Sequence, residues 1–315
     1  MSKNKGDQVR HSGKLRSEIP YYILALPGLI LLLLFAYFPM SGVLLAFKQY
    51  TYKGGIFGSP FANPWYNNFL FFLNNGSIAL RAVRNTIMFN TISFLFNSAV
   101  SIAIAIMLKE MRGRMFVKIT QSAMFLPYFI SWAVIGCILT NALLKYDGGI
   151  INKAIVGLGF SRVDFYENPW YWLVILVLTE AWHSCGYSSI IYYGVLSGVN
   201  PEYYEAAQID GASKWQQIRR ISIPMLKSTF VTLFLLSVGG MLKGNLTMVI
   251  GTTNLNPSLL EVTDFIDVYI YRSGIKNGEM VFSSAISLLQ SVFGLILILI
   301  SNALIRRYDQ ELAIF

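Results

Sequence analysis

Six apolar stretches of about 20 residues or more dominate the chain and restrict it to folds that cross a membrane. The 315 residues are 55% hydrophobic and only 13% charged, which is too apolar for a soluble domain. Helices satisfy their own backbone hydrogen bonds inside a bilayer, so we expect an all-α polytopic membrane protein. The predicted transmembrane helices cover residues 20–47, 83–108, 118–145, 170–196, 224–250 and 283–305.

The positions of the basic residues predict the orientation of these spans. Six spans place both termini on one side, which then carries five Lys and Arg in the N-terminal tail, four after the second span, four around residues 214–227 and two after the sixth span. These fifteen exceed the nine on the other side. Because basic loops stay in the cytoplasm, we expect a multi-pass cell-membrane protein with both termini cytoplasmic. The net charge of +9 is therefore a topology signal and does not indicate nucleic-acid binding.

The same topology divides the chain into three parts. Residues 1–19 form a predicted cytoplasmic basic tail, which we expect either to be disordered or to lie on anionic lipid headgroups. Residues 20–306 form the six-helix transmembrane domain, and residues 307–315 a cytoplasmic C-terminal tail.

A polar segment, residues 197–225, separates the fourth and fifth spans, yet it carries helix signals in place of linker composition. Asn200 is a good N-cap and Pro201 suits the first helical position, so we expect a short helix to about Ile209. Gly211 supplies a bend. Ser213 with Gln216 forms a predicted capping box for a second short helix, which should end before Pro224. A structured loop of this kind predicts a docking surface.

Polar side chains inside the spans predict helix contacts and a cavity. Asn85, Asn90 and Asn97 in the second span are typical of helix–helix packing, and Pro127 should bend the third span. Ionisable groups at membrane depth tend to face a cavity or a partner. The candidate residues for a substrate path are Glu180, Trp182, His183, Tyr187, Tyr192, Lys243 and Asn245.

Two of these candidates have structural alternatives. His183 could make a satisfied structural hydrogen bond, and Lys243 could extend outward to the membrane surface. The glycines around Lys243 favour a break in the fifth span that lines the cavity.

The chain lacks the sequence patterns of an enzyme. It has no Gly-x-x-x-x-Gly-Lys-Ser/Thr phosphate loop, so it should not hydrolyse ATP itself. Only His11 and His183 are present, which excludes a His-Glu-x-x-His zinc site. His183 and Ser188 are five residues apart on one predicted helix and do not align for serine catalysis. We therefore expect no catalytic residues, metal or cofactor in this chain.

The polar segment resembles the EAA loop of ATP-binding-cassette (ABC) importer permeases. The resemblance rests on Glu205-Ala206-Ala207, Gly211 after three further residues, and Ile221-Ser-Ile-Pro224 after nine more. It implies a coupling helix that docks on a cytoplasmic ATPase subunit and the six-helix fold of type I importer permeases. The docking residues implied are Tyr203, Glu205, Ala206, Ala207, Asp210, Gly211 and Ala212.

Softer matches look like the carbohydrate-uptake branch of this family. They lie at Phe47-Lys48, Asn68-Phe69, 84–86 and 125–131, and residues 261–274 with Asn302-Ala303 look like its complex-polysaccharide or oligosaccharide subgroup. One departure is Asn245-Leu-Thr-Met248, where a Phe or an acidic residue is expected. The resemblance implies a sugar importer in which ATP and Mg belong to a partner ATPase dimer. It also implies a second homologous permease and an extracellular solute-binding protein.

The alternatives are a permease for another solute class, such as peptides or amino acids, an ion-coupled secondary transporter, or a membrane scaffold that transports nothing. The many aromatic residues and the lack of a charge-compensating cluster in the spans favour sugars over peptides. The candidate path residues could also pack against the second permease.

Overall fold

The computed structural model describes residues 20–74 and 76–314, and within them the fold is all-α, with one isolated bridge between Lys48 and Phe61. This confirms the predicted fold class; the basic tail predicted at 1–19 lies outside the described residues. The first helix is Pro20–Phe47. The α-helices that follow are α2 (Gly55–Gly58), α3 (Asn67–Asn74), α4 (Gly76–Glu110), α5 (Arg114–Phe125), α6 (Trp132–Ile138), α7 (Ile150–Gly157), α8 (Pro169–Gly198), α9 (Glu202–Ile209), α10 (Lys214–Gln217), α11 (Ile223–Met225), α12 (Lys227–Gly239), α13 (Leu246–Thr253), α14 (Leu260–Thr263), α15 (Ile266–Tyr271) and α16 (Met280–Tyr308).

Short 3₁₀ and π segments join or end several of these helices. They are η1 (Leu33–Tyr37) and η2 (Phe38–Phe47) in the first helix, η3 (Leu126–Phe129), η4 (Leu139–Leu143), η5 (Ile218–Ser222), η6 (Pro257–Leu259), η7 (Arg272–Lys276) and η8 (Gln310–Leu312).

Three helices are long and apolar enough to cross a membrane unbroken, namely the first helix, α4 and α16, and they contain three of the predicted spans. Two more crossings are possible if each of two bent helix pairs is one span. The predicted fourth span lies within α8, whose 30 residues reach about 45 Å. α8 carries a run of polar residues and is not among the three helices that are long and apolar enough to cross unbroken.

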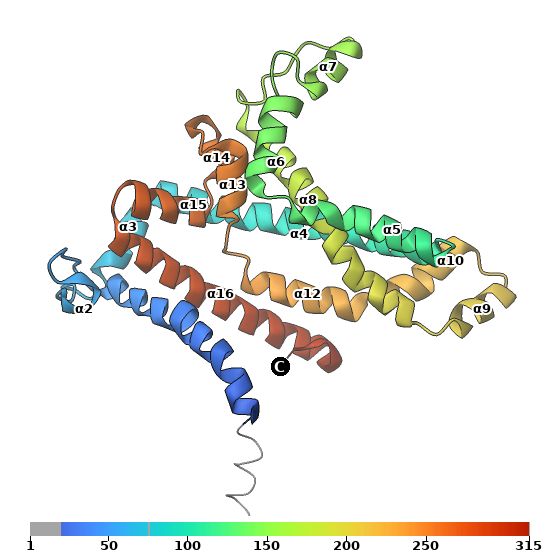
Figure 1. Ribbon diagram of the computed structural model, residues 1–315, viewed down its shortest axis with the longest axis horizontal. Coiled ribbons are helices and arrows are strands. Elements are labelled where there is room, and N and C mark those ends of the chain that lie inside the picture. Colours follow the sequence, from blue (N-terminus) through green and yellow to red (C-terminus); the bar gives the residue numbers. More distant parts are fainter. Residues whose placement is uncertain (1–19, 75, 315) are drawn as a thin grey trace, which may run out of the picture.

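The bundle is built around α4 and α8, which pack against each other along much of their length (Figure 1). Small and polar residues of α4 are fully buried: Ser101 and Ala105 contact α8, whereas Ala82 and Thr86 contact α15. Small side chains let helix backbones approach closely where lipid offers no hydrophobic drive. Leu196 of α8 and Leu226 complete one buried cluster with Ala105.

The third predicted span is not continuous. Its two halves, Arg114–Phe129 and Trp132–Leu143, meet at an angle of 94°. Pro127 lies in the 3₁₀ turn, Ile130 is extended, and Ser131 caps α6 by accepting a hydrogen bond from Val134 N. The bend expected at Pro127 is therefore present, but the local capping makes it a full break.

The break that the glycines around Lys243 predict in the fifth span, 224–250, is present. α12 ends at Gly239, and α13 begins only at Leu246 after a non-helical stretch, residues 240–245, which we call the break. The Asn245 side chain caps α13 by accepting from Met248 N at 3.0 Å. α13 then packs against α6, with Gly136 and Gly251 in close backbone contact. The glycines and the cap explain why the apolar run does not stay helical.

Residues 252–282, expected to be an outer loop, are instead folded against the bundle. Val262, Phe265 and Val268 are buried in the same cluster as Trp172 of α8. Asp264 between them is fully buried as well. The hydropathy of this stretch is too low to mark a span, but its apolar residues recur at helical spacing and fill the space beside α4.

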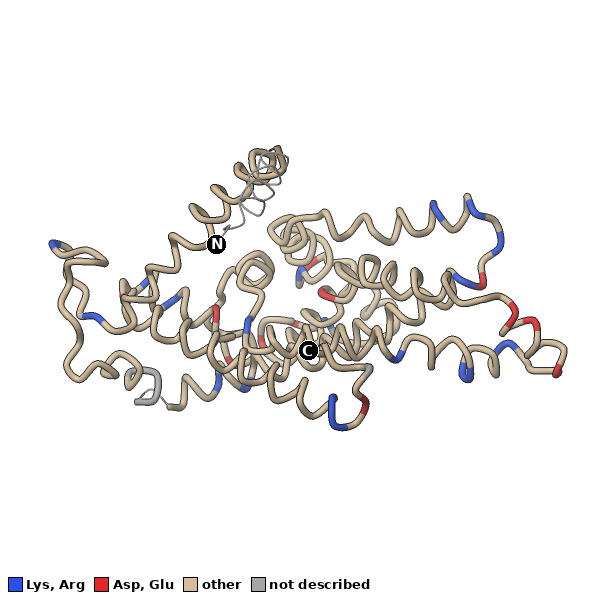
Figure 2. Tube along the Cα trace, turned by 90° about the horizontal axis from the view of Figure 1, so that it is seen from below, with Lys and Arg blue, Asp and Glu red and all other residues tan. Residues whose placement is uncertain are grey.

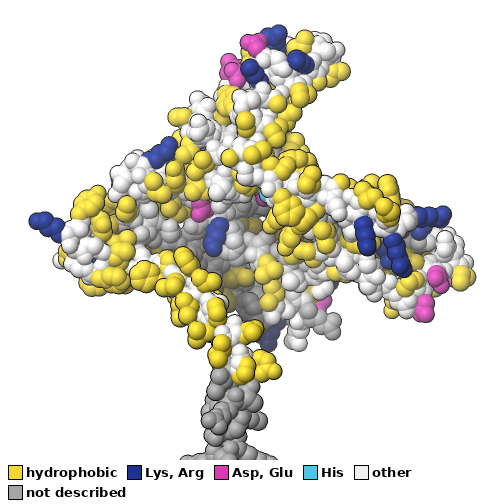
Figure 3. Space-filling model, viewed as in Figure 1, with side chains coloured by type: hydrophobic (Ala, Val, Ile, Leu, Met, Phe, Trp, Pro, Cys, Tyr) yellow, Lys and Arg dark blue, Asp and Glu magenta, His cyan; other side chains and the backbone are white. Residues whose placement is uncertain are grey.

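The long helices run between two ends of the molecule (Figure 1). The α9 end holds α9 and α10, where Lys214 pairs with Glu110 at 2.8 Å. The α3 end holds α2, α3 and the start of α4. Charged residues of both signs lie along the chain at the α9 end (Figure 2), and hydrophobic side chains cover the first helix and much of the bundle (Figure 3). The C-terminal residues fold back, since Ile314 N donates to Asn302 Oδ1 at 2.8 Å.

Candidate functional site

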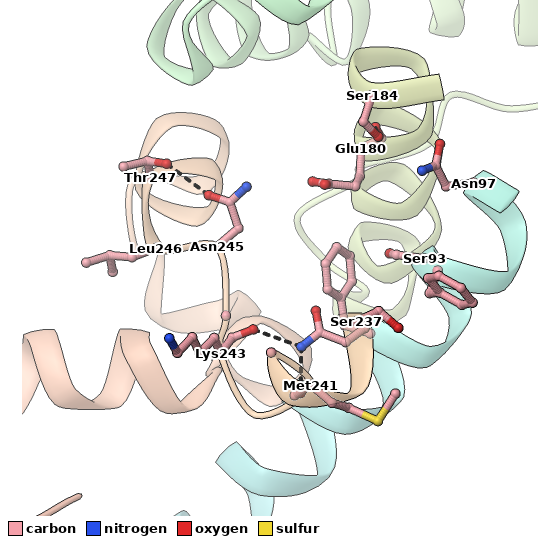
Figure 4. Close-up of a pocket in the computed structure, with 15 residues that line it drawn as sticks. Ser93, Asn97, Glu180, Ser184, Ser237, Met241, Lys243, Asn245, Leu246 and Thr247 are labelled. Carbon is pink, nitrogen blue, oxygen red and sulfur yellow. Dashed lines mark hydrogen bonds between the residues drawn. The ribbon is translucent and has the colours of Figure 1, made fainter. Parts of the chain in front are cut away.

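A cavity of about 560 Å³ lies between α4, α8 and the break. Its walls are mostly amide, hydroxyl and aromatic groups, from Phe89, Asn90, Ser93, Phe94 and Asn97 of α4, Glu180 and Ser184 of α8, Ser237 of α12, and residues of the break and the start of α13. Figure 4 shows Glu180 and Asn245 pointing into the space between the three elements, whereas Lys243 and Leu246 point away from it. Polar groups beside aromatic rings suit a hydroxyl-rich solute.

Side chains from other helices hold the break in place. Asn90 Nδ2 on α4 donates to the carbonyl oxygens of Met241 and Lys243, at 2.7 and 2.8 Å. Gln290 Nε2 on α16 donates to the Leu242 carbonyl at 2.6 Å. Three successive carbonyls freed by the loss of helix are thus satisfied, as irregular backbone at membrane depth requires.

Asp267 on α15 holds the break from the other direction. Its carboxylate accepts a hydrogen bond from Gly244 N and another from Gln290 Nε2 at 3.1 Å. A side chain at Gly244 would collide with Phe265 and approach Asp267. The glycine is therefore needed for close packing of the break against α15.

Glu180 is the acidic group of the cavity. Its carboxylate and the Asn245 amide point toward each other across the space (Figure 4). Glu180 Oε2 is buried and makes no hydrogen bond among the described residues. A buried acceptor without a partner is costly, so it is available to a donor that enters the cavity.

Lys243 lines the cavity through its backbone, while its exposed side chain extends away from Glu180 and Asn245 (Figure 4). The structure therefore brings together three of the seven predicted path residues, Glu180, Lys243 and Asn245.

His183 and Tyr187 lie elsewhere, at the bend between α5 and α6. His183 Nε2 is 3.3 Å from the Ile130 carbonyl oxygen, and its ring lies 4.5 Å from that of Trp132. The Tyr187 ring stacks on Tyr128 at 4.9 Å. Of the two roles considered for His183, the structure therefore shows the structural hydrogen bond.

The remaining two candidates on α8 do not reach the cavity either. Trp182 is exposed on the helix surface, and Tyr192 is buried in the cluster with Leu196 and Leu226. Residues five or ten positions along a helix point in different directions, so the residues of α8 singled out by type lie on several faces.

Sequence reasoning missed the groups that shape the cavity from outside α8. Asn90 was expected to pack between helices, but its amide donates hydrogen bonds to the non-helical break, and its place in the cavity wall was not foreseen. Gln290 and Asp267 had no local signal, because their partners are 48 and 23 residues away.

The polar segment has the predicted local structure. Asn200 Oδ1 accepts from Glu202 N at 3.1 Å at the start of α9, and Gly211 has the positive φ of +76° that the bend requires. Ser213 and Gln216 form the capping box. The second helix was expected to end before Pro224. It instead continues from α10 through a π turn to Met225, and the chain bends by 49° before α12. The wide turn accommodates the missing proline N–H.

The polar segment is anchored on one side and exposed on the other. Tyr204 faces inward, with its hydroxyl 3.1 Å from Ser222 Oγ and Lys109 over its ring. The other side presents Tyr203, Glu205, Ala206, Asp210 and Gly211 to solvent, with Ala207 and Ala212 half-buried. Ile209 is 86% and Trp215 67% exposed, which is unusual for such side chains in a polar loop.

No group of three or more His, Cys, Asp and Glu in the described part of the chain could hold a metal ion.

Comparison with known proteins identifies relatives over nearly the whole chain. The family model for the binding-protein-dependent transport system inner membrane component matches residues 97–313. The polygalacturonan/rhamnogalacturonan transport system permease protein YteP of Bacillus subtilis strain 168 is 33% identical over 298 residues, covering 95% of this chain and 91% of YteP. The arabinooligosaccharides transport system permease protein AraP of the same organism is 26% identical, with 92% and 90% covered.

Two solved structures resemble the fold closely. One is a bacterial ABC transporter involved in the import of the acidic polysaccharide alginate, with a TM-score of 0.82, 29% identity, and 95% of this chain and 99% of that chain covered. The other is a bacterial alginate ABC transporter in complex with an alginate pentasaccharide-bound periplasmic protein, with the same TM-score and identity and 94% and 97% covered.

Proposed function

The chain belongs to the family of binding-protein-dependent transport system inner membrane components, and from this premise we propose that it is the permease subunit of an ATP-driven importer of oligosaccharides. The observation that carries the proposal is the agreement between relatives named for polysaccharide and oligosaccharide transport and a cavity walled by amides, hydroxyls and aromatic rings. Because these relatives are named for the transport of sugars, they favour this function over import of peptides or amino acids. Family membership favours it over an ion-coupled transporter.

The α9 end is the cytoplasmic end in this proposal, with both termini on the same side. The excess of Lys and Arg predicted there supports this orientation. Lys227 near the start of α12 lies 3.8 Å from Asp309, which keeps the described C-terminal residues beside the same end. The α3 end then faces the outside.

A separate ATPase docks on the exposed side of the polar segment. Ile209 and Trp215 offer apolar anchors, Glu205 and Asp210 offer charges, and Ala206 allows close approach. The inward contacts of Tyr204 and the pair Lys214–Glu110 transmit a push on this segment to α4. Closure of the ATPase dimer on ATP would then switch the transmembrane helices between inward-open and outward-open states.

The substrate passes from an external solute-binding protein into the cavity. There Glu180 and Asn245 bind hydroxyl groups, and Phe89 and Phe94 contact sugar faces. A second, homologous permease covers the open side of the cavity and the exposed apolar face of the first helix, and Lys243, Trp182 and Tyr187 lie where it can meet them.

Proteoliposomes that contain the complete complex and the cognate binding protein test the function directly. Accumulation of labelled oligosaccharide should require both ATP and the binding protein, and should fail for labelled peptides of similar mass. Uptake driven by an ion gradient without ATP would refute the proposal.

A further inference from the structure

At the α3 end, one buried carboxylate holds two arginines side by side. Asp264 is fully buried, and its oxygens accept from Arg81 Nη2 at 2.7 Å and from Arg272 Nη2 at 2.7 and 2.8 Å. The two guanidinium groups come from segments 191 positions apart and remain 34% and 26% exposed. Asp264 therefore orders two cations at the surface while cancelling only one of their charges.

These arginines line a pocket of about 340 Å³ between the start of α4 and the residues that follow α15. Lys276 adds a third cation, and Glu279 adds a carboxylate at the wall. With Asp264 included, three positive charges face two negative ones, which leaves one net positive charge. The Nε–H groups of both arginines are buried and make no hydrogen bond within the described residues, so an incoming group can reach only the exposed part of each side chain.

The pocket stands at the end of a helix that is longer than a bilayer needs. The 35 residues of α4 span about 52 Å, whereas the hydrocarbon core is about 30 Å thick. Arg81 lies in the second turn of α4, so it can lie outside the hydrocarbon core of the bilayer. Exposed Ile78 lines the same pocket, and exposed Ile275 is beside it, an apolar rim around charge that suits a protein contact.

The pocket is also connected to the cavity. Asp264 and Asp267 are three residues apart on either side of the α15 start, and Asp267 binds the break through Gly244 and Gln290. A group that pulls on Arg81 or Arg272 therefore acts on a segment whose next turn fixes the cavity wall.

We propose that this pocket binds a carboxylate side chain of the external solute-binding protein. Docking of that protein then acts on the break through Asp264 and Asp267. The proposal rests on the proposed function and on the orientation given above. Guanidinium and carboxylate groups form paired, charge-assisted hydrogen bonds, and the net positive charge of the pocket selects an anionic partner group. Lys276 at the exposed rim steers that group inward.

The test measures ATP hydrolysis by the purified full complex in nanodiscs, titrated with substrate-loaded binding protein. Lys276→Glu should raise the half-saturating concentration of binding protein by about tenfold and leave the maximal rate unchanged, because rim charges act mainly on association. Added salt should weaken docking to the wild-type complex more than docking to the variant. Lys276 is exposed and outside the buried cluster, so the variant should fold.

The matched control is Lys53→Glu, an exposed lysine between the first helix and α3 that does not line the pocket. An equal rise in the half-saturating concentration of binding protein for Lys53→Glu would overturn the proposal, because general surface charge would then explain the effect. The proposal would also be overturned if the rise for Lys276→Glu occurred only in nanodiscs with anionic lipid, because the pocket would then bind a lipid headgroup. An Asp→Lys or Glu→Lys change in the binding protein that restores Lys276→Glu would support it.

The outcomes separate the two proposals. If the binding protein does not stimulate the wild-type complex, the proposed function fails. If it stimulates wild type and Lys276→Glu equally at every concentration, the docking pocket alone is refuted.

Discussion

Asn90 on α4 donates a hydrogen bond to the backbone carbonyl of Lys243, 153 residues later in the chain, at 2.8 Å. A second bond from the same amide reaches Met241. These contacts join the central helix of the bundle to the break, so the shape of the cavity wall depends on one side chain of α4. Gln290 and Asp267 hold the same stretch from α16 and α15.

Replacing Asn90 with Leu should loosen the break. The variant keeps side-chain size but leaves two carbonyls without donors, a loss of about 1–3 kcal/mol per group if water does not replace them. We expect a thermal midpoint several degrees lower for the purified complex and at least several-fold slower uptake. Asn141→Leu is the control, because the exposed Asn141 donates only to Cys137 Sγ at 3.3 Å. If both variants match wild type, Asn90 does not position the break.

Features of the fold that depend only on neighbouring residues could be predicted from the sequence. The ends of α9 and α10 depend on Asn200, Gly211 and the Ser213–Gln216 box, all of which act within three residues of their own position. The first helix coincides with its predicted span for the same reason, since a long apolar run needs no distant partner to be helical in a membrane.

Features that depend on residues far apart in the sequence could not be predicted. The glycines around Lys243 indicated a break in the fifth span, but they did not indicate that Asn90, Gln290 and Asp267 stabilise it, because no local pattern links these residues to the break. Residues 252–282 were expected to be an outer loop between the fifth and sixth spans, and no local pattern indicated that they pack against the bundle. Asp264 is nonetheless buried, since Arg81 and Arg272 neutralise it from other segments.

The bend in the polar segment should be sensitive to a single methyl group. Gly211 has φ of +76°, where an alanine costs about 1–2 kcal/mol. Gly211→Ala should therefore misplace α9 relative to α10 and reduce ATP hydrolysis stimulated by saturating binding protein several-fold, with normal membrane insertion. Gly159→Ala carries the same strain at φ of +88° outside this segment and should retain full stimulation. Equal rates for the two variants would count against docking here.

The exposed carboxylate of the same segment allows a charge test. Glu205 is solvent-exposed and no ion pair holds it among the described residues, so Glu205→Arg should leave the fold intact. We expect it to abolish stimulated hydrolysis through repulsion at the ATPase interface. Glu167→Arg, an exposed change far along the chain, is the control. Normal stimulation in Glu205→Arg would exclude a role for this side chain.

The cavity carboxylate should affect substrate binding more than stability. Glu180→Gln keeps the shape of the side chain, and no hydrogen bond to Oε2 is lost. We expect an unchanged thermal midpoint and about a tenfold rise in the substrate concentration for half-maximal uptake, because an amide NH₂, which only donates, replaces a carboxyl oxygen that accepts from sugar hydroxyls. Unchanged uptake kinetics would remove Glu180 from the substrate path.

The buried ion cluster should behave differently from an exposed pair of similar geometry. Asp264→Asn removes the charge that Arg81 and Arg272 share and leaves both guanidinium groups without their anion. Breaking a buried pair costs about 3–5 kcal/mol, and partial exposure of both arginines places this variant at or below the lower limit. Asp147 pairs with Arg162 on the surface, so Asp147→Asn should cost less than about 1 kcal/mol. Thermal unfolding of the purified complexes separates these values. Equal midpoints would show that solvent screens Asp264 as fully as Asp147, and a connection from the outer pocket to the break would then have no energetic basis.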